Sequence, residues 1–411
     1  MRSLLILLVF LAACDDEGGA SPDPGQQAAV DLAVVEDAAV DAAPPEPDAL
    51  PPDAAGDAAV VDAGADLGPA VPTGQCGAGD VTGWLYLDED AADETHRAGE
   101  RSAGDPAVGE GFSVLTPDGE RPVEPCEDGS YALQDLPKGP ALLLPPTPEN
   151  QRCTRRNCPK SFASAAIEGR AVVVVMGDSI PVVGDRPLFP NRLATLFEGL
   201  VELDVRNVAV AGSTSPQWLP GQRNYENRLR PELAEADLVI VSLGGNDLLE
   251  YMSNPALISN IPAAVAGARE LVVTIVERLV TIVQAIREEN PGVDVLYCLY
   301  PDYTQATTHQ LWGLAGRLLG AGTMRDVLET ALAAVPEDED ILIADMLNAW
   351  DGLDVGLYLY DALHFNAAGQ TLYAEEIFQT LGGVHLGESP FGELGHHPLG
   401  TEHSFGYEPT P

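Results

Sequence analysis

Positive charge is scarce in this chain of 411 residues. It has 64 Asp and Glu against 21 Lys and Arg, and its lysines are Lys138 and Lys160 alone. The formal net charge is −43 and the pI is about 4.1. A surface of this kind argues against binding of nucleic acid or of an anionic membrane surface through charge.

Long apolar runs are also missing. No stretch of eighteen uncharged apolar residues occurs, so no conventional transmembrane helix is expected. The first residues instead read as a targeting signal, with Arg2 followed by the apolar run Leu4 to Leu11 and by Leu11-Ala-Ala-Cys14. This ending resembles a bacterial lipobox, which implies a signal peptide over 1–13 and a lipidated Cys14. The protein would then be an exported lipoprotein of the cell envelope, periplasmic or on the cell surface. An ordinary signal peptide with a chance cysteine is the alternative.

Residues 14–72 have little that could form a core. Between residues 15 and 70 the segment is mostly Ala, Asp, Pro, Gly and Val, with fourteen acidic residues and no Lys or Arg. Such a composition cannot bury enough apolar surface to offset chain entropy. We expect a disordered, self-repelling stalk. An interaction tail is the alternative.

A small β-domain is predicted over 73–147. Four short apolar runs separated by turn residues favour strands at 81–87, 112–115, 130–133 and 141–144. Glu127-Asp-Gly-Ser-Tyr131 with Leu136-Pro-Lys-Gly139 resembles the prealbumin-like B-repeat sandwiches of bacterial surface proteins. In those repeats an acidic loop can bind calcium, and Leu87-Asp-Glu-Asp90 with Asp93 is such a run. A solvated acidic loop is the simpler alternative.

Cysteine usage fits export. Besides Cys14 there are five cysteines, which cannot all pair, and the sequence does not fix their connectivity. Cys76 with Cys126 and Cys153 with Cys158 are possible disulfides. Cys298 lies in a strand-like run and is expected to be a buried free thiol.

After a linker at 148–170, strand and helix patterns alternate over 171–382. Strands are predicted at 171–176, 201–210, 238–243, 293–299 and 341–345, and the main helices at 258–286 and 369–381. This alternation predicts a parallel sheet with helices on both faces. The tail 383–411 lacks periodicity and is expected to be loose. Its adjacent His396 and His397 are only a weak signal for a metal.

Four motifs occur in order within this segment. They are Gly177-Asp178-Ser179 at the end of a buried strand, Asn207-Val-Ala-Val-Ala-Gly212, Gly244-Gly-Asn-Asp247 and Asp361-Ala-Leu-His364. Together they resemble the GDSL/SGNH hydrolase family, which implies an α/β fold with three layers and a flavodoxin-like strand order. Phe365 follows the histidine, where proline is frequent in the family.

The resemblance implies a role for each motif. Ser179 would be the nucleophile, because a serine hydroxyl needs a base and an orienting group that Asp361 and His364 can supply. His364 would accept and return the proton. The backbone N–H groups of Ser179 and Gly212 and the side-chain amide of Asn246 would form the oxyanion hole. Asp178 and Asp247 would be positioning residues. Taken singly, Gly212 could be an ordinary turn and Asn246 a helix cap.

The sequence therefore predicts a secreted, lipid-anchored serine esterase that uses an acyl-enzyme and needs no metal or organic cofactor. Polar residues around 213–224, with Trp218, favour acetyl or other short acyl groups on a neutral carbohydrate. A lipase or lysophospholipase with the same mechanism is one alternative. A surface binding or adhesion protein with an inactive hydrolase domain is another.

Overall fold

The computed structural model describes the greater part of the chain beyond residue 80. It covers 81–87, 111–144 without 128 and 134–135, 151–153, 159–386 without four two-residue gaps (255–256, 258–259, 320–321 and 337–338), 390–391 and 405–409. The predicted signal peptide with Cys14, the stalk, the acidic loop and His396–His397 lie outside the described residues. Those expectations, and the proposed domain limits, stay predictions.

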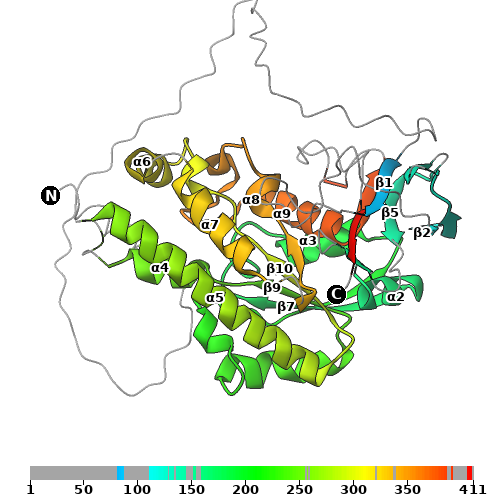
Figure 1. Cartoon of the computed structure of the whole chain (residues 1–411), viewed down its shortest axis with the longest axis horizontal. Helices are drawn as coiled ribbons and strands as arrows, with labels where there is room; N and C mark the ends of the chain where they lie inside the picture. Colours follow the sequence, from blue (N-terminus) through cyan, green and yellow to red (C-terminus); the bar gives the residue numbers. More distant parts are fainter. Residues whose placement is uncertain are drawn as a thin grey trace, which may run out of the picture. The chain divides into compact units, whose positions relative to one another are not determined.

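The part of the chain after residue 158 alternates helices with strands (Figure 1). Its elements are α2 (Ser161–Ile167), β7 (Arg170–Gly177), α3 (Phe189–Leu196), β8 (Glu202–Asn207), η1 (Ser215–Trp218), η2 (Tyr225–Leu229), η3 (Arg230–Glu235), β9 (Leu238–Ser242), α4 (Gly245–Met252), α5 (Ile261–Glu289), β10 (Asp294–Cys298), η5 (Tyr303–Gln305), α6 (Gln310–Leu319), α7 (Thr323–Ala334), β11 (Leu342–Ala344), α8 (Met346–Ala349), η7 (Val355–Tyr358) and α9 (Ala367–Thr380).

These strands form one parallel sheet. Its order is β11-β10-β9-β7-β8 and every pair of neighbours runs parallel. Numbered along the chain, this is the flavodoxin-like order 2-1-3-4-5. All five strands predicted for this segment are found, and so is the predicted parallel sheet.

The sheet is buried on both faces. In β7, Val173 and Val175 belong to one core cluster and Val174 and Met176 to the other, because alternate side chains of a strand point to opposite faces. The first cluster contains residues of α2, α3 and α9, and the second residues of α5 and η1 to η3. Figure 1 shows α5 and α9 on opposite sides of the strands. A strand covered on both faces explains the unbroken apolar run of β7.

The helix limits follow from local capping. The Asn260 side chain accepts a hydrogen bond from the Ala263 N–H and begins α5 three residues later than predicted. The Asn366 side chain accepts one from Gly369 and begins α9. Within the described residues, no helix is both long enough and apolar enough to cross a membrane.

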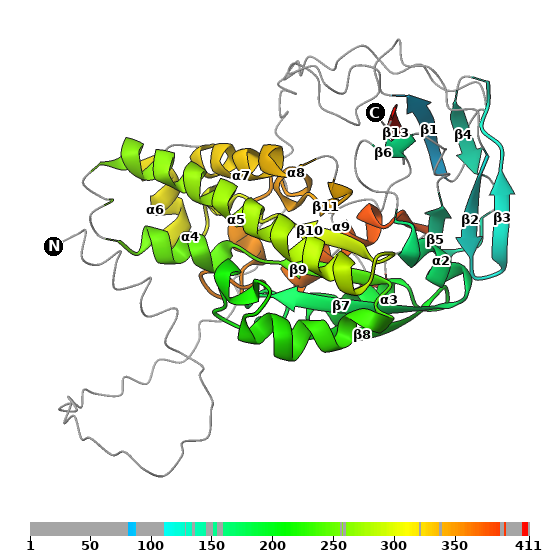
Figure 2. The same ribbon diagram turned by 60° about the horizontal axis from the view of Figure 1, so that its bottom comes forward.

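Two further sheets of four strands each are built from residues on both sides of this segment (Figure 2). One has the order β4-β1-β13-β6 and the other β12-β5-β2-β3. Their strands are β1 (Val81–Leu87), β2 (Phe112–Thr116), β3 (Gly119–Val123), β4 (Ser130–Leu133), β5 (Gly139–Leu144), β6 (Gln151–Cys153), β12 (Gly383–Leu386) and β13 (Phe405–Pro409). The predicted strands are present here, whereas the likeness to a B-repeat sandwich stays a prediction.

The expectation that the tail beyond residue 382 is loose was wrong for two stretches. β12 pairs antiparallel with β5, and β13 pairs with β1 and β6. Val384 is fully buried in a cluster that includes Phe112, Tyr131 and Leu143. Four or five residues are too few to show a periodic pattern, and their order comes from partner strands distant in the sequence.

The cysteines follow the expectation in one respect. Cys298 in β10 is a buried free thiol. Cys76 and Cys158 lie outside the described residues, so both proposed disulfides stay predictions.

The docking of β12 can be tested at Val384. Val384→Ala removes buried methyl groups and should lower the free energy of unfolding by about 2 kcal/mol, as measured by urea denaturation. Ile167→Ala is the control, because this isoleucine is 49% exposed and should change stability by less than about 0.5 kcal/mol. Equal effects of the two substitutions would contradict the burial of β12.

Candidate active site

The Gly-Asp-Ser turn leaves β7 at a point of very close strand packing. Gly177 has φ +133°, and a Cβ atom there would lie 1.8 Å from the carbonyl oxygen of Ser242 in β9. The Asp178 N–H donates to that same oxygen at 2.9 Å. Only glycine satisfies both the positive φ and the lack of space. The next residue but one, Ser179, is therefore presented at the carboxyl end of the sheet.

Asp178 is buried beside the serine. Its Oδ1 accepts from the Ile180 N–H at 3.1 Å, and its Oδ2 accepts from the Tyr300 hydroxyl. Burial raises the pKa of Asp178 to about 6, although the hydrogen bonds from Tyr300 and Ile180 and the field of His364 act in the opposite direction. The carboxyl group thus fixes the turn rather than facing solvent, as expected for a positioning residue.

Asp361 and His364 form a close pair. The His364 Nδ1 and the Asp361 Oδ2 are 2.6 Å apart, and the Asp361 Oδ1 accepts from the backbone N–H groups of Leu363 and His364 at 2.7 Å each. Burial raises the pKa of Asp361, but the hydrogen bonds from the His364 ring and from these N–H groups outweigh it and bring the pKa below its usual range. The carboxylate is therefore ionised and orients the imidazole.

The other ring nitrogen of His364 is unpaired. Among the described residues, Nε2 is buried and has no hydrogen-bond partner. The loop that carries it touches the segment after the serine, because the Asp185 N–H donates to the Phe365 carbonyl at 3.2 Å and the Asp185 Oδ2 accepts from the Ala367 N–H. An unpaired nitrogen next to the serine turn is available for proton transfer.

Asn246 is oriented by the residue that follows the second motif rather than acting as a helix cap. Gly244, with φ +115°, precedes α4 as its N-cap, so Asn246 lies within the first turn. Its amide Nδ2 donates to the Ser213 carbonyl at 3.0 Å. The Ser213 hydroxyl donates to the Gly177 carbonyl at 2.9 Å. Gly212, at φ +75°, therefore belongs to a loop tied to both Asn246 and the end of β7.

Asp247 organises a network that the sequence did not reveal. It is buried and accepts from the Ser215 N–H at 2.8 Å, from the Ser215 hydroxyl at 2.6 Å and from Arg278 of α5 at 3.3 Å. Arg278 also donates to the Ser215 hydroxyl at 3.0 Å. Asp247 thus links Ser215, the first residue of η1, to α5, and its positioning role stays a prediction. Tyr300 could have been suspected, since it follows β10 at the same edge of the sheet, whereas nothing in α5 marks Arg278.

A partly open cavity lies beside Ser179 and Asn246. Its walls are mainly aliphatic and aromatic and come from α4, η5, α6, α7 and the histidine loop. The lining side chains other than Ser179 and Asn246 include Leu248, Leu249, Met252, Tyr303, Trp312, Met324, Leu328 and Leu363. The polar loop at 213–224, which favoured a sugar in the sequence, contributes none of them.

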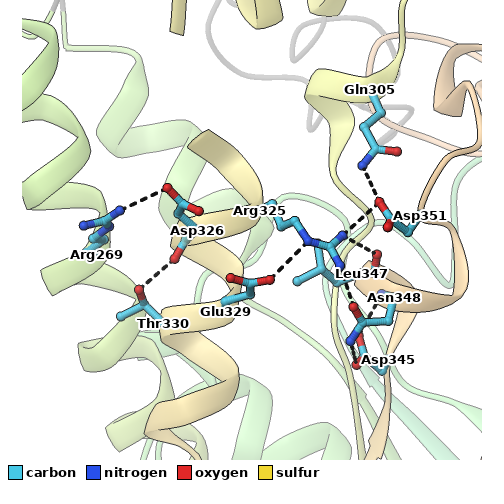
Figure 3. Close-up of polar contacts among 10 residues, drawn as sticks. All are labelled: Arg269, Gln305, Arg325, Asp326, Glu329, Thr330, Asp345, Leu347, Asn348 and Asp351. Atoms are coloured by element: carbon cyan, nitrogen blue, oxygen red, sulfur yellow. Dashed lines mark hydrogen bonds and ion pairs between the residues drawn. The ribbon is translucent and has the colours of Figure 1, made fainter. Parts of the chain in front are cut away.

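The α7 wall of the cavity is fixed by an arginine (Figure 3). Arg325 donates to Asn348 Oδ1 at 2.6 Å and to Asp351 Oδ1 at 3.1 Å. At the other side of the helix, Asp326 pairs with Arg269 of α5. Met324 and Leu328 therefore line the cavity from a helix that is held by α8 on one side and by α5 on the other. No set of three or more metal-ligating side chains gathers in the described part of the chain.

Comparison with known proteins gives a family for this part of the chain. Residues 175–372 match the model of the GDSL-like Lipase/Acylhydrolase family. No curated protein matches the chain. Similar solved structures include an extracellular lipase of Streptomyces rimosus (20% identity, 51% of this chain and 99% of that one, TM-score 0.42). Others are a phospholipase A1 of Streptomyces albidoflavus (18%, 51% and 99%, 0.39) and a family 3 carbohydrate esterase of Clostridium thermocellum (17%, 51% and 94%, 0.32). This match supports a GDSL/SGNH hydrolase domain in this segment, and the chain is an ester-hydrolysing enzyme.

The burial of Asp178 predicts a pH dependence of stability. Its folded pKa of about 6 lies above the ordinary value of 3.8, so its stabilising contribution is complete below about pH 4 and is lost as pH rises through 6. Asp178→Asn cannot lose a proton and escapes this loss. Between pH 4 and pH 8 the variant should gain about 3 kcal/mol of unfolding free energy relative to wild type, measured by urea denaturation. Asp118→Asn, at an exposed position, is the control. A difference that does not change with pH would contradict the burial of an ionisable group here.

Proposed function

We propose that the chain hydrolyses carboxylic esters through an acyl-enzyme formed on Ser179. The observation that carries this proposal is the Asp361–His364 pair at 2.6 Å, whose imidazole Nε2 lies near the Gly-Asp-Ser turn, is buried, and has no hydrogen-bond partner in the described part of the chain. Asp361 holds the proton on Nδ1 and so keeps Nε2 as the acceptor. The Ser179 Oγ forms a bond to the ester carbonyl carbon while its proton passes to Nε2.

The remaining steps use groups of this chain and water. The proton on Nε2 passes to the leaving alcohol oxygen as the ester C–O bond breaks. Water then gives a proton to Nε2 and attacks the acyl carbon. The bond to the Ser179 Oγ breaks, the acid is released, and Oγ takes the proton back from Nε2. The oxyanion accepts from the N–H groups of Ser179 and Gly212 and from the Asn246 amide. One amide hydrogen of Asn246 is donated to the Ser213 carbonyl, which orients the group and leaves the second for the oxyanion.

The acyl group occupies the apolar cavity. Its walls favour a chain of several methylenes over acetyl, because each buried methylene contributes about 0.8 kcal/mol. We therefore propose a lipase or lysophospholipase activity in place of the activity on short acyl groups of a carbohydrate that the sequence predicted. A preference for short acyl groups is the alternative outcome of the chain-length experiment.

Export and a lipid anchor at Cys14 complete the proposal. They rest on the sequence of the first fourteen residues and on the acidic segment that follows it. The anchor would keep the enzyme at a membrane surface that its own negative charge does not favour.

The nucleophile is tested with Ser179→Ala. This substitution should abolish ester hydrolysis and labelling by a fluorophosphonate probe, because it removes the only group that forms the covalent bond. Ser164→Ala, at an exposed serine of α2, is the matched control and should retain both. Hydrolysis or labelling that persists in Ser179→Ala would remove Ser179 from the mechanism.

The acyl group is tested with p-nitrophenyl esters of increasing chain length. From acetate upwards kcat/KM should rise about fourfold per methylene until the cavity is filled, as expected from its apolar walls. Leu249→Trp narrows the cavity and should abolish the rise while sparing acetate. Leu357→Trp, at a side chain that is 61% exposed, is the control. A profile that falls from acetate in the wild type would restore the preference for short acyl groups.

A further inference from the structure

Backbone groups of the loop that carries the proposed base are held by specific partners. The N–H groups of Leu363 and His364 donate to Asp361. The His364 carbonyl accepts from the Tyr360 N–H at 2.7 Å. The carbonyls of Ala362 and Leu363 are the two between Asp361 and His364, and neither accepts a backbone hydrogen bond from the described residues. Instead they accept hydrogen bonds from two side chains of the segment that contains η5 and α6. This segment therefore affects the geometry of the Asp361–His364 pair.

Those two side chains are Trp312 and Tyr303. The Trp312 indole Nε1 donates to the Ala362 carbonyl at 2.5 Å, and the Tyr303 hydroxyl donates to the Leu363 carbonyl at 2.9 Å. Both rings are buried, with exposed fractions of 2% and 8%. Burial and the charges of Asp178 and Asp361 raise the pKa of Tyr303 well above its ordinary value, so its hydroxyl remains a donor.

The two rings form one rigid unit. Their centroids are 5.1 Å apart, and Tyr303 is also stacked on Phe365 at 6.3 Å, the residue after the histidine. α6 approaches η5 closely enough for this because it has glycine at the contact. A Cβ atom at Gly316 would lie 2.7 Å from the Thr304 carbonyl, and one at Gly313 would lie 3.0 Å from that of Thr307.

The same rings line the cavity beside Ser179. One face of the unit thus meets the acyl group while its polar edges hold the histidine loop. Core packing alone would not require two donors to reach adjacent carbonyls, since apolar rings of the same size would fill the space.

We propose that Tyr303 and Trp312 are positioning residues that hold the Asp361–His364 loop in register with the serine. This inference rests on the proposed function of Ser179 and His364. By fixing the carbonyls of Ala362 and Leu363, the pair sets where the imidazole Nε2 lies relative to the Ser179 hydroxyl. A misplaced base transfers the proton poorly, so the cost falls on the chemical step rather than on substrate binding.

The test uses Trp312→Phe and Tyr303→Phe, which keep an aromatic ring and remove the donor. With p-nitrophenyl acetate as substrate, kcat should fall about tenfold in each variant while KM changes less than twofold. The rate of labelling by a small fluorophosphonate should fall by the same factor, because it reports activation of the serine. Thermal unfolding of each variant is measured alongside.

Trp350→Phe is the matched control. The Trp350 indole is also buried and packs on Phe365 at 5.1 Å, but among the described residues its Nε1 has no hydrogen-bond partner. This variant should keep kcat and the labelling rate within twofold. A drop in Trp350→Phe equal to that in the other two would assign the effect to lost packing and overturn the proposal.

Other outcomes distinguish a failure of the positioning role from a failure of the proposed function. If Trp312→Phe and Tyr303→Phe raise KM but keep the labelling rate, the rings only line the cavity and the positioning role is wrong. Unchanged kcat in both, with an inactive Ser179→Ala, also overturns it while leaving the proposed function intact. If Ser179→Ala is as active as wild type, the proposed function itself fails. Should one of the two variants not fold, the other still decides.

Discussion

The site depends on one close approach, between Gly177 of β7 and the Ser242 carbonyl of β9. Neighbouring parallel strands lie so near each other here that no side chain fits at residue 177. The chain must therefore turn out of the sheet at this residue, and the Asp178 N–H is fixed on the same carbonyl. The loop after β8 is then joined to the turn by the Ser213 hydroxyl. Three segments meet because the carboxyl ends of parallel strands share one edge of the sheet.

His364 is not placed by the end of a strand of the parallel sheet. Its loop follows η7, and the residue after the histidine, Phe365, is fully buried and contacts the rings of Trp350, Tyr373 and Tyr303. The proline frequent at this position in the family would lack that ring. Three carboxylates near the site are paired with donors: Asp178 with Tyr300, Asp247 with Arg278 and Asp361 with His364. In a chain of such high negative charge, these contacts prevent unpaired carboxylates from accumulating around the reaction.

Features set by neighbouring residues, or by a pattern that repeats along the chain, could be predicted from the sequence. Buried strands such as β7 show as apolar runs, and strand–helix alternation predicts the parallel sheet. The Asp361–His364 pair was also predictable, because its members are only three positions apart in one loop. Contacts across long stretches of sequence were not. Arg278 is one of several charged residues on α5, and only the folded helix brings it to Asp247. Much of the apolar lining of the cavity was missed for the same reason, since α6 and α7 lie between the third and fourth motifs and far from both in the sequence.

The tail strands make the α/β segment an insertion within the flanking sheets. β5 precedes this segment and β12 follows it, yet the two pair residue by residue from Gly383 with Leu142 to Leu386 with Gly139. Two covalent crossings therefore join the segment to those sheets, one entering at α2 and one leaving after α9. A single proteolytic cut at either crossing would leave the pieces tethered by the other. A hydrolase fragment ending at residue 382 would also expose the edge of β5, which invites pairing with another chain.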